Sequence, residues 1–382
     1  MNTRASKSLK LHSIGSSTEG DSPNLCLVHR IKAQSSFSIL SEQYSELSAY
    51  EEDEILLYEQ IYYFGQGSAK ISGGYSDENG NYIVVIGDHI AYRYEIISIN
   101  GRGAFGEVLE CIDRKTLRKV AVKVLNKKPM YLRSGKNEAK TLEKLAEIDD
   151  FQVLLQKIES FEFRGHFFIV FEYLYENLFQ YIEKRHFVGI GLAGVRTVAK
   201  QVLESLKLLH SIGGVHCDLK PENIMFKEEG LGCVKVIDYG SACFQGGKML
   251  SYVQSRYYRA PEVVLGSDYC EKIDLWSTGC LLFECFTGQV LFPSESEAEL
   301  LAMIQVAIGP PARNLARDSK FKENYFDSMG TLKAIEVDEA LCRRIEDCAE
   351  PKFESFLRLF LKWDPIERIS AERALTHPWL MT

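Results

Sequence analysis

The clearest helical pattern in the sequence lies between residues 195 and 209, where apolar side chains recur every three or four positions: Val195, Val198, Val202, Leu206 and Leu209. This spacing predicts a helix with one buried face. Gly213 and Gly214 follow the last of these positions and predict the end of the helix. We expect this face to be hydrophobic core and not a cofactor site.

Shorter apolar runs predict strands. Residues 120–124 and 167–171 are rich in β-branched and aromatic side chains, as buried strands are. Residues 94–100 and 107–112 have the same character and flank a glycine-rich loop. A helical segment at 137–146 follows the third of these strands in the chain. Because the glycine-rich loop joins two strands, it disfavours a dinucleotide-binding fold, in which such a loop joins a strand to a helix.

The first part of the chain divides into two segments. Residues 1–40 are rich in serine and have little periodicity, which predicts a mobile tail. From residue 47 the composition changes: residues 47–59 begin with Ser48 and acidic residues suited to a helix start, and residues 61–65 predict a short aromatic strand. Asn79 and Gly80 predict a hairpin turn. So many aromatic side chains would not stay solvated, so we expect residues 41–93 to pack against the rest of the chain.

Composition limits the classes of function. The 382 residues are 46% hydrophobic and 26% charged, which is ordinary for a soluble protein. The net charge of −8 argues against direct nucleic-acid binding, because phosphate is bound by basic surfaces. The ten cysteines show no CxxC spacing, so neither zinc nor disulfides are expected. With no signal-peptide core and no run long enough to span a membrane, we expect an intracellular protein, cytoplasmic and/or nuclear.

Candidate chemistry is concentrated in the loop at residues 216–223, of sequence HCDLKPEN. Phosphoryl transfer needs a carboxylate to accept the proton of the attacking hydroxyl, a cation near the migrating phosphate and oxygen ligands for magnesium. Asp218, Lys220, Asn223 and the nearby Asp238 supply these groups. An isolated His-x-Asp would be weak evidence, since it occurs by chance in turns and caps.

Four further motifs stand in order around this loop: GRGAFGEV at 101–108, VAVK at 120–123, DYG at 238–240 and APE at 260–262. Together with HCDLKPEN they resemble the signature of the eukaryotic protein kinases, from about Tyr94 to the end of the chain. The resemblance implies a bilobal α+β fold. Its β-rich small lobe would comprise residues 94–173 and its α-rich large lobe residues 174–380. A compact insert at about 299–350 is similar to that of the CMGC group.

The kinase resemblance also implies ATP, with Mg²⁺ held by Asn223 and Asp238 and with Mn²⁺ as an alternative. A lysine in an apolar strand needs an anionic partner, so Lys123 is expected to meet Glu138, with Glu143 as the second candidate. Val236 is expected to contact the nucleotide. The implied nucleotide site comprises Gly101, Gly103, Ala104, Phe105, Gly106, Val108, Ala121, Lys123, Phe171, Glu172, Tyr173, Leu174, Asn177, Asn223, Met225 and Asp238.

Departures from the general kinase pattern resemble the DYRK family, the dual-specificity tyrosine-phosphorylation-regulated kinases. Cys217 stands where many phosphorylation-activated kinases carry arginine. The acidic, tyrosine-rich residues 47–65 are similar to the homology box that precedes the catalytic domain in this family. Residues 252–259 are similar to its activation segment, so Tyr252 is identified as the tyrosine that the kinase phosphorylates on itself. Leu250 replaces the first tyrosine of the family's doublet.

This resemblance implies phosphorylation of Ser and Thr on other proteins, with proline after the target and arginine before it. Arg256 and Arg259 are expected to hold the phosphate of Tyr252 and to shape the proline site. Glu262 and Arg368 are expected to form a buried ion pair, and Asp274 to support the catalytic loop. Two alternatives stay open: a catalytically silent scaffold, and a sister CMGC kinase activated by another enzyme. A monomer that does not associate with membranes is expected.

Overall fold

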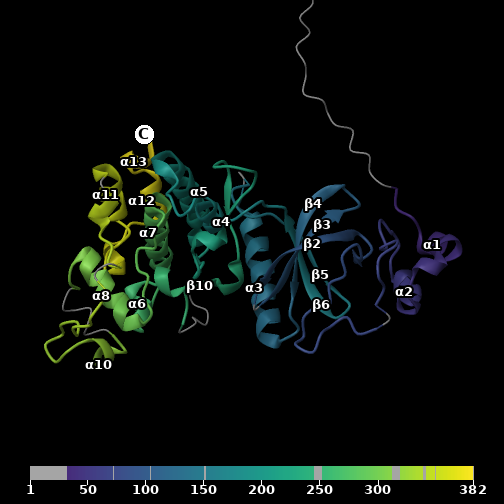
Figure 1. The fold of residues 1–382 in the computed structure, drawn as a ribbon, viewed down its shortest axis with the longest axis horizontal. Helices are drawn as coiled ribbons and strands as arrows, with labels where there is room; N and C mark the ends of the chain where they lie inside the picture. Colours follow the sequence, from purple (N-terminus) through teal and green to yellow (C-terminus); the bar gives the residue numbers. More distant parts are fainter. Residues whose placement is uncertain are drawn as a thin grey trace, which may run out of the picture.

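The computed structural model describes residues 32–71, 73–103, 105–149, 152–244, 252–311, 319–338, 341–348 and 350–381. A lobe built on a sheet and a helical lobe lie side by side, joined by the chain that follows strand β6 (Figure 1). This arrangement confirms the predicted bilobal fold. Within the described residues, no helix is both long and apolar enough to cross a bilayer.

The small lobe contains a six-stranded antiparallel sheet in the order β1-β2-β3-β4-β6-β5, flanked by helix α3 (Pro129–Ala146). Ala121 pairs with Phe171, and Lys123 pairs with Val108 and Ile169. Because side chains alternate along a strand, Ala121 and Lys123 share the face that lines the space between the lobes. The strands are β1 (His89–Ile90), β2 (Tyr94–Gly103), β3 (Gly106–Asp113), β4 (Arg118–Leu125), β5 (Lys157–Phe163) and β6 (His166–Glu172).

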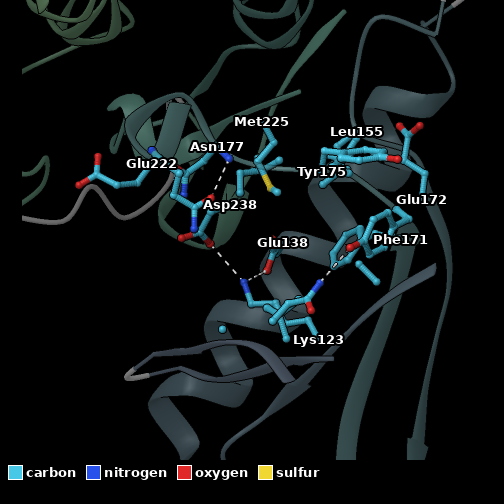
Figure 2. A pocket seen from close by; sticks show the side chains of 18 residues that line it. Lys123, Glu138, Leu155, Phe171, Glu172, Tyr175, Asn177, Glu222, Met225 and Asp238 are labelled. Carbon is cyan, nitrogen blue, oxygen red and sulfur yellow. Dashed lines mark hydrogen bonds and ion pairs between the residues drawn. The ribbon is translucent and has the colours of Figure 1, made fainter. Parts of the chain in front are cut away.

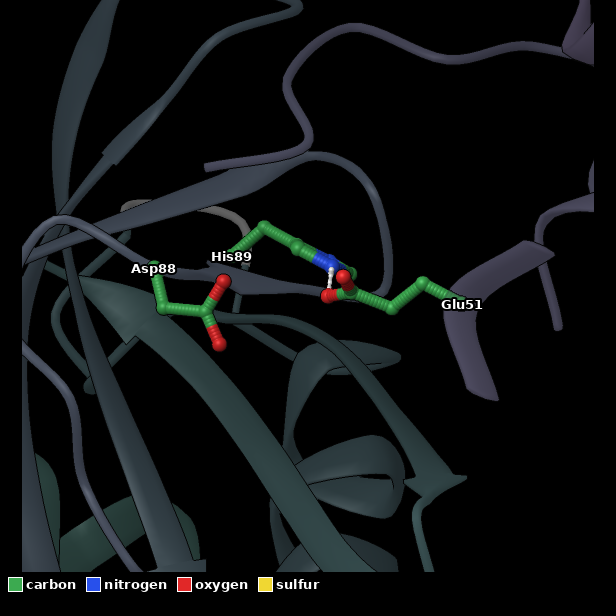
Figure 3. A group of neighbouring side chains, drawn as sticks. All are labelled: Glu51, Asp88 and His89. Atoms are coloured by element: carbon green, nitrogen blue, oxygen red, sulfur yellow. Dashed lines mark hydrogen bonds and ion pairs between the residues drawn. The ribbon is translucent and has the colours of Figure 1, made fainter. Parts of the chain in front are cut away.

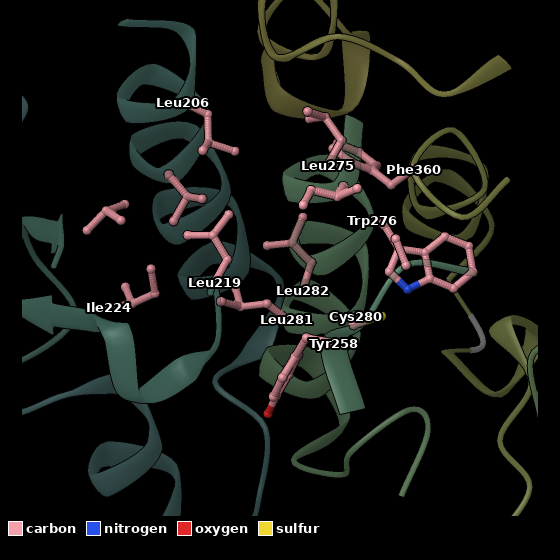
Figure 4. Packing of buried hydrophobic residues seen from close by; sticks show 14 of the residues in the cluster. Leu206, Leu219, Ile224, Tyr258, Leu275, Trp276, Cys280, Leu281, Leu282 and Phe360 are labelled. Atoms are coloured by element: carbon pink, nitrogen blue, oxygen red, sulfur yellow. The ribbon is translucent and has the colours of Figure 1, made fainter. Parts of the chain in front are cut away.

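The large lobe is built around two apolar helices, α5 (Gly191–Ser211) and α7 (Lys272–Thr287). Leucines from both helices point toward each other in the core (Figure 4). The other elements are α4 (Leu178–Lys184), α6 (Pro261–Val264), α8 (Glu297–Ile308), α10 (Lys322–Tyr325), α11 (Pro351–Leu357), α12 (Ala371–Leu375), α13 (Pro378–Met381), β7 (Gly214–Val215), β8 (Ile224–Phe226), β9 (Val234–Val236) and β10 (Cys243–Phe244).

The expected ion pair of the large lobe is present. The two guanidinium nitrogens of Arg368 donate to the two carboxylate oxygens of Glu262 at 2.5 and 2.6 Å. Both side chains are buried, and the guanidinium also donates to the carbonyl oxygens of Lys362 and Lys272. Since each charge has its counter-charge and hydrogen bonds, the pair satisfies the conditions under which buried charges are tolerated.

The N-terminal extension, residues 32–88, packs on the small lobe as expected. Its helices are α1 (Ser36–Glu42) and α2 (Ala49–Glu54), and the helix start predicted at Ser48 is confirmed, with a capping box formed by Ser48 and Glu51. Apolar side chains of the extension, among them Ile55, Phe64 and Tyr82, share one core with residues of the sheet. The assigned end of the mobile tail at residue 40 is wrong, because α1 begins at Ser36 and buries Ile39. Residues 1–31 lie outside the described part of the chain.

Two local predictions for the extension had different outcomes. The turn at Asn79 and Gly80 is confirmed, with Gly80 in the left-handed region at φ +85° and a bridge between Ser76 and Tyr82. The strand at 61–65 is wrong: within this segment only Ile61 is paired, through an isolated bridge to Gln34.

A cluster of buried charged and polar side chains joins the extension to the sheet. Glu51 of α2 lies beside His89, with 3.0 Å between Oε1 and Nε2, and Asp88 lies close by (Figure 3). Arg164, in the turn between β5 and β6, reaches the same carboxylates with its fully buried guanidinium. Lys70 lies 3.1 Å from both Glu51 and Asp88. Because Arg164 and Lys70 supply the positive charge, this cluster is an ion-pair network and needs no metal ion.

Candidate active site

A cavity of about 420 Å³ opens between the lobes (Figure 2). The faces of β3 and β4 form one wall and the chain after β6 forms the rear wall. Met225 and Ile237 of the large lobe contribute apolar contacts on the opposite side. Eleven of the predicted nucleotide residues line this cavity: Gly101, Val108, Ala121, Lys123, Phe171, Glu172, Tyr173, Leu174, Asn177, Met225 and Asp238. Its mostly apolar lining, with charged side chains at one end, suits a heterocycle with a charged tail.

Three charged groups converge at the inner end of this cavity. Lys123 Nζ lies 2.7 Å from Glu138 Oε2 and 3.2 Å from Asp238 Oδ1. Burial alone would lower the pKa of Lys123, but the carboxylates of Glu138 and Asp238 outweigh it, so the pKa is raised and the lysine stays charged. The predicted contact with Glu138 is confirmed. Glu143, the other candidate, pairs instead with Lys157.

The catalytic-loop candidates are held by a buried aspartate of α7. The two carboxylate oxygens of Asp274 accept the backbone N–H groups of His216 and Cys217 at 2.8 and 3.0 Å. This contact fixes a sharp turn, in which Cys217 has φ +69°. Lys220 Nζ lies 2.7 Å from Asp218 Oδ2. The supporting position expected for Asp274 is therefore observed.

Ser255 is a residue of this site that the sequence analysis missed. Its hydroxyl donates to Asp218 Oδ1 at 2.8 Å, and its backbone N–H donates to the same oxygen at 3.1 Å. Lys220 Nζ in turn donates to Ser255 Oγ at 3.0 Å. These contacts hold the carboxylate of Asp218 in one orientation. A hydroxyl residue shortly before the APE motif was the available signal in the sequence.

Asn223 and Asp238 offer the oxygen ligands that a hard divalent cation prefers. The amide nitrogen of Asn223 donates to the backbone oxygen of Asp218 at 2.8 Å, so its amide oxygen is the end that remains for a metal ion. Asp238 has φ +62°, an unfavourable conformation for a residue that is not glycine. Burial would raise the pKa of Asp238, but the charge of Lys123 lowers it, so the carboxylate is ionised. The donor set therefore fits a divalent cation.

The glycine-rich loop lies at the edge of the cavity. Gly106 has φ +141°, and a Cβ there would lie 2.0 Å from the carbonyl oxygen of Val124. Only glycine fits. Gly103, Phe105, Gly106 and Asn223 do not line the cavity itself. Ala104 falls outside the described residues.

Other side chains of the cavity differ from the sequence prediction. Val236 is buried and does not line the cavity, whereas the next residue, Ile237, does, because successive side chains of an extended chain point in opposite directions. The other cavity residues that sequence reasoning missed are Asn100, Leu155, Tyr175, Gln180 and Glu222. Most of them are sequence neighbours of predicted residues. Leu155 carries no such signal.

The candidate phosphorylation site lies beside one of its two predicted arginines. Tyr252 is 65% exposed, and the guanidinium of Arg259 lies 4.0 Å above the centre of its ring. Arg259 also donates to the carbonyl oxygens of Val253 and Gln254 and pairs with Glu297. Arg256 donates to the backbone oxygens of residues 294 and 295. Leu250 lies outside the described residues.

The cleft between the two lobes combines three features: a lysine–glutamate pair, an ionised aspartate after β9, and a loop that carries Asp218, Lys220 and Asn223. Together these features define a protein kinase domain. Residues 94–380 match the family described as the protein kinase domain. The chain belongs to this family, and within it to the DYRK family, as its relatives show. The kinase domain implies use of ATP and a divalent metal ion.

Three relatives illustrate the similarity. The DYRK-family kinase pom1 of Schizosaccharomyces pombe is 39% identical over 354 residues, which cover 87% of this chain and 33% of the relative. Human dual specificity tyrosine-phosphorylation-regulated kinase 3 is 37% identical, with coverage of 89% and 64%. Human kinase 4 of the same name is 38% identical, with coverage of 88% and 68%. The chain thus spans 33%, 64% and 68% of the length of these three relatives.

Proposed function

We propose that this chain is an ATP-dependent dual-specificity kinase that phosphorylates its own Tyr252 and then Ser and Thr on protein substrates. The observation that carries the proposal is the convergence of Lys123, Glu138 and Asp238 in the cleft, together with the pair of Asp218 and Lys220 in the catalytic loop. A scaffold would have no need to keep this set of charges intact in a desolvated site.

The residues divide the chemistry as follows. Lys123, oriented by Glu138, binds phosphate oxygens at the inner end of the cleft. Asn223 and Asp238 would hold Mg²⁺, which would neutralise charge on the phosphates. Asp218 accepts the proton of the substrate hydroxyl, and Lys220 stabilises the charge of the phosphoryl group in transfer. Most of the rate enhancement then comes from positioning and electrostatics.

The proposed preference for proline after the target residue rests on hydrogen bonds below the catalytic loop. Arg259 occupies the carbonyl oxygens of Val253 and Gln254, and Gln254 has φ +65°. The backbone N–H of a substrate residue placed here could not donate to these two carbonyl oxygens, because Arg259 already uses them. Proline has no N–H and loses nothing. The exposed carboxylate of Glu222 beside the catalytic loop supports arginine before the target.

The proposal is tested with the full chain expressed in bacteria, beside the Asp218→Asn variant. Mass spectrometry measures phosphate on Tyr252, and peptides that differ only in proline or arginine measure Ser/Thr phosphorylation. We expect phosphotyrosine and peptide turnover only in the wild type. Turnover with unmodified Tyr252 would refute autophosphorylation and point to activation by another enzyme. A folded wild type without any turnover would refute the kinase assignment and favour a scaffold.

A further inference from the structure

Asn126 lies on the short connection between β4 and α3, the two elements that carry Lys123 and Glu138. The side chain is almost fully buried, at 4% exposure. Its backbone N–H donates to the carbonyl oxygen of Phe105, at the tip of the glycine-rich loop, at 3.0 Å. Its Oδ1 accepts the N–H of Lys128 at 3.0 Å. Asn126 therefore contacts both the nucleotide loop and the start of α3.

The two hydrogens on Nδ2 of Asn126 are used by the N-terminal extension. Nδ2 donates to the backbone oxygen of Asn79 at 3.1 Å and to Oδ1 of Asn81 at 2.6 Å. Beside it, Lys127 N–H donates to the carbonyl oxygen of Gly80 at 2.9 Å. An asparagine side chain has two donor hydrogens, so no donor of Asn126 is left over.

The turn that receives Asn126 is held rigid by its own contacts. Asp77 Oδ1 accepts the N–H groups of Asn79 and Asn81 at 2.9 and 2.7 Å, and Asn81 Nδ2 donates to Asp77 Oδ2 at 3.0 Å. Ser76 is tied to His166 of β6 at 2.9 Å, and the ring of Tyr82 is buried. The turn is thus fixed to the sheet independently of Asn126.

The start of α3 has no side-chain cap, although Tyr131 in its first turn packs against Phe105 of the glycine-rich loop, with 5.4 Å between ring centres. Its N-cap is Lys128, which makes no side-chain capping hydrogen bond, and Pro129 follows. When no side chain caps a helix, the backbone N–H groups of its first turn need other hydrogen-bond partners. The contact of Asn126 with Lys128 therefore ties the first turn of α3 to the turn of the extension.

We propose that Asn126 is a positioning residue for the kinase reaction, through which the turn at 77–81 of the N-terminal extension fixes the glycine-rich loop and α3 relative to β4. Loss of this contact frees α3 to move Glu138 away from Lys123. The phosphate-binding form of the site is then only partly populated, and apparent nucleotide affinity falls in proportion. The inference rests on the proposed kinase function.

Two variants remove the contact to different degrees. Asn126→Asp keeps the side-chain size and the oxygen that accepts the N–H of Lys128. It replaces the Nδ2 donor with an oxygen, which then faces the acceptor oxygens of Asn79 and Asn81. Asn81→Ala removes one acceptor of Asn126 and the side-chain bond from Asn81 to Asp77 Oδ2, while the backbone N–H of Asn81 still donates to Asp77 Oδ1. Lys136→Ala is the matched control, because Lys136 also lies on α3 and its ion pair with Glu162 of β5 is exposed.

The readouts are KM for ATP, KM for a Ser/Thr peptide, ATP affinity by direct titration, and hydrogen exchange of α3. We expect KM and Kd for ATP to rise about five- to tenfold in Asn126→Asp and about two- to threefold in Asn81→Ala. Exchange at the start of α3 should accelerate, while the peptide KM stays the same. The double variant should be no worse than Asn126→Asp, because both changes act through one contact.

Wild-type ATP affinity and α3 exchange in Asn81→Ala would overturn the inference, as would additive losses in the double variant or an equal rise in the peptide KM. If Asn126→Asp fails to fold, Asn81→Ala alone decides. A wild type that transfers no phosphate would refute the proposed function instead, and direct ATP titration and exchange would still decide on Asn126.

Discussion

Replacing Arg164 by methionine tests whether the buried charge network holds the N-terminal extension in place. The guanidinium is fully buried and lies 2.9 Å from Glu54 Oε2 and 3.0 Å from Glu51 Oε1. It also lies over the ring of Tyr75, 4.1 Å from its centre. Methionine fills similar volume, so the variant removes charge and hydrogen bonds with little loss of packing.

The expected loss follows from the charges that remain. Removing one partner of a buried ion pair costs about 3–5 kcal/mol, because the other charge is left buried without compensation. Here Lys70 still lies 3.1 Å from Glu51 and Asp88, so we expect the lower end, about 3 kcal/mol. Against a total stability of about 5–15 kcal/mol for a typical domain, this is a large fraction.

The assay is urea unfolding of the full chain at pH 8 and pH 5, beside the control Lys136→Met. In the wild type, burial would raise the pKa of Glu51, but the hydrogen bond with His89 and the charge of Lys70 outweigh it and hold the pKa well below its usual range. Without Arg164, Glu51 keeps His89 and Lys70, whereas Glu54 loses its ion pair with the guanidinium. The depressed pKa of Glu51 gives stability that is present above the pKa of the unfolded carboxyl group and lost only as pH falls below it, so the loss should be similar at pH 8 and pH 5. A loss below about 1 kcal/mol would refute this account.

Three further substitutions have defined outcomes. Burial raises the pKa of Glu284 from 4.5 to about 7. The protonated side chain therefore stabilises the fold below pH 4.5, and this stabilisation is lost as pH rises through 7. Glu284→Gln keeps an acceptor for Tyr258 and does not ionise, so between pH 4.5 and pH 7 its stability relative to the wild type should rise by on the order of 3 kcal/mol in unfolding titrations. Arg368→Met leaves Glu262 buried without its partner and should lower stability by about 3–5 kcal/mol, seen as a lower melting temperature; an unchanged melting temperature would contradict this. Gly106→Ala places a Cβ 2.0 Å from a β4 carbonyl oxygen and should weaken ATP binding in titrations while most of the fold persists; wild-type affinity would show that the loop adapts.

How much of the site could be predicted depends on where its information lies. Asp218, Lys220 and Asn223 stand within one short loop, so sequence order alone brings them together. The pairing of Lys123 with Glu138 needed one further step, the burial of a lysine in an apolar strand. Ser255 could not be assigned a role in this way, because it stands 37 positions after Asp218 and only the fold brings the two side chains together.

The extension shows why strand propensity misled. Tyr62 and Tyr63 do not pair as a strand; both N–H groups donate to the carbonyl oxygen of Tyr92, and the rings lie beside Lys115 and Arg114. Aromatic residues favour strands because they fit a half-buried pleated surface, and here cations of the turn between β3 and β4 cover the rings without a strand ladder. The aromatic pattern at residues 61–65 correctly indicated that these side chains pack against the small lobe, but it did not identify the residues they pack against.

Two contacts of the extension differ in chemistry, so they can be separated. Arg164 holds α2 through charge, whereas the turn at 77–81 holds Asn126 through neutral hydrogen bonds. The two are joined through Tyr75, whose ring stacks on Tyr82 next to that turn, with 6.5 Å between ring centres. Stacked rings tolerate small shifts, whereas hydrogen bonds do not. Arg164→Met should therefore loosen α2 in hydrogen exchange and leave KM for ATP nearly unchanged; a rise equal to that of Asn126→Asp would mean that the extension acts on the active site as one rigid unit.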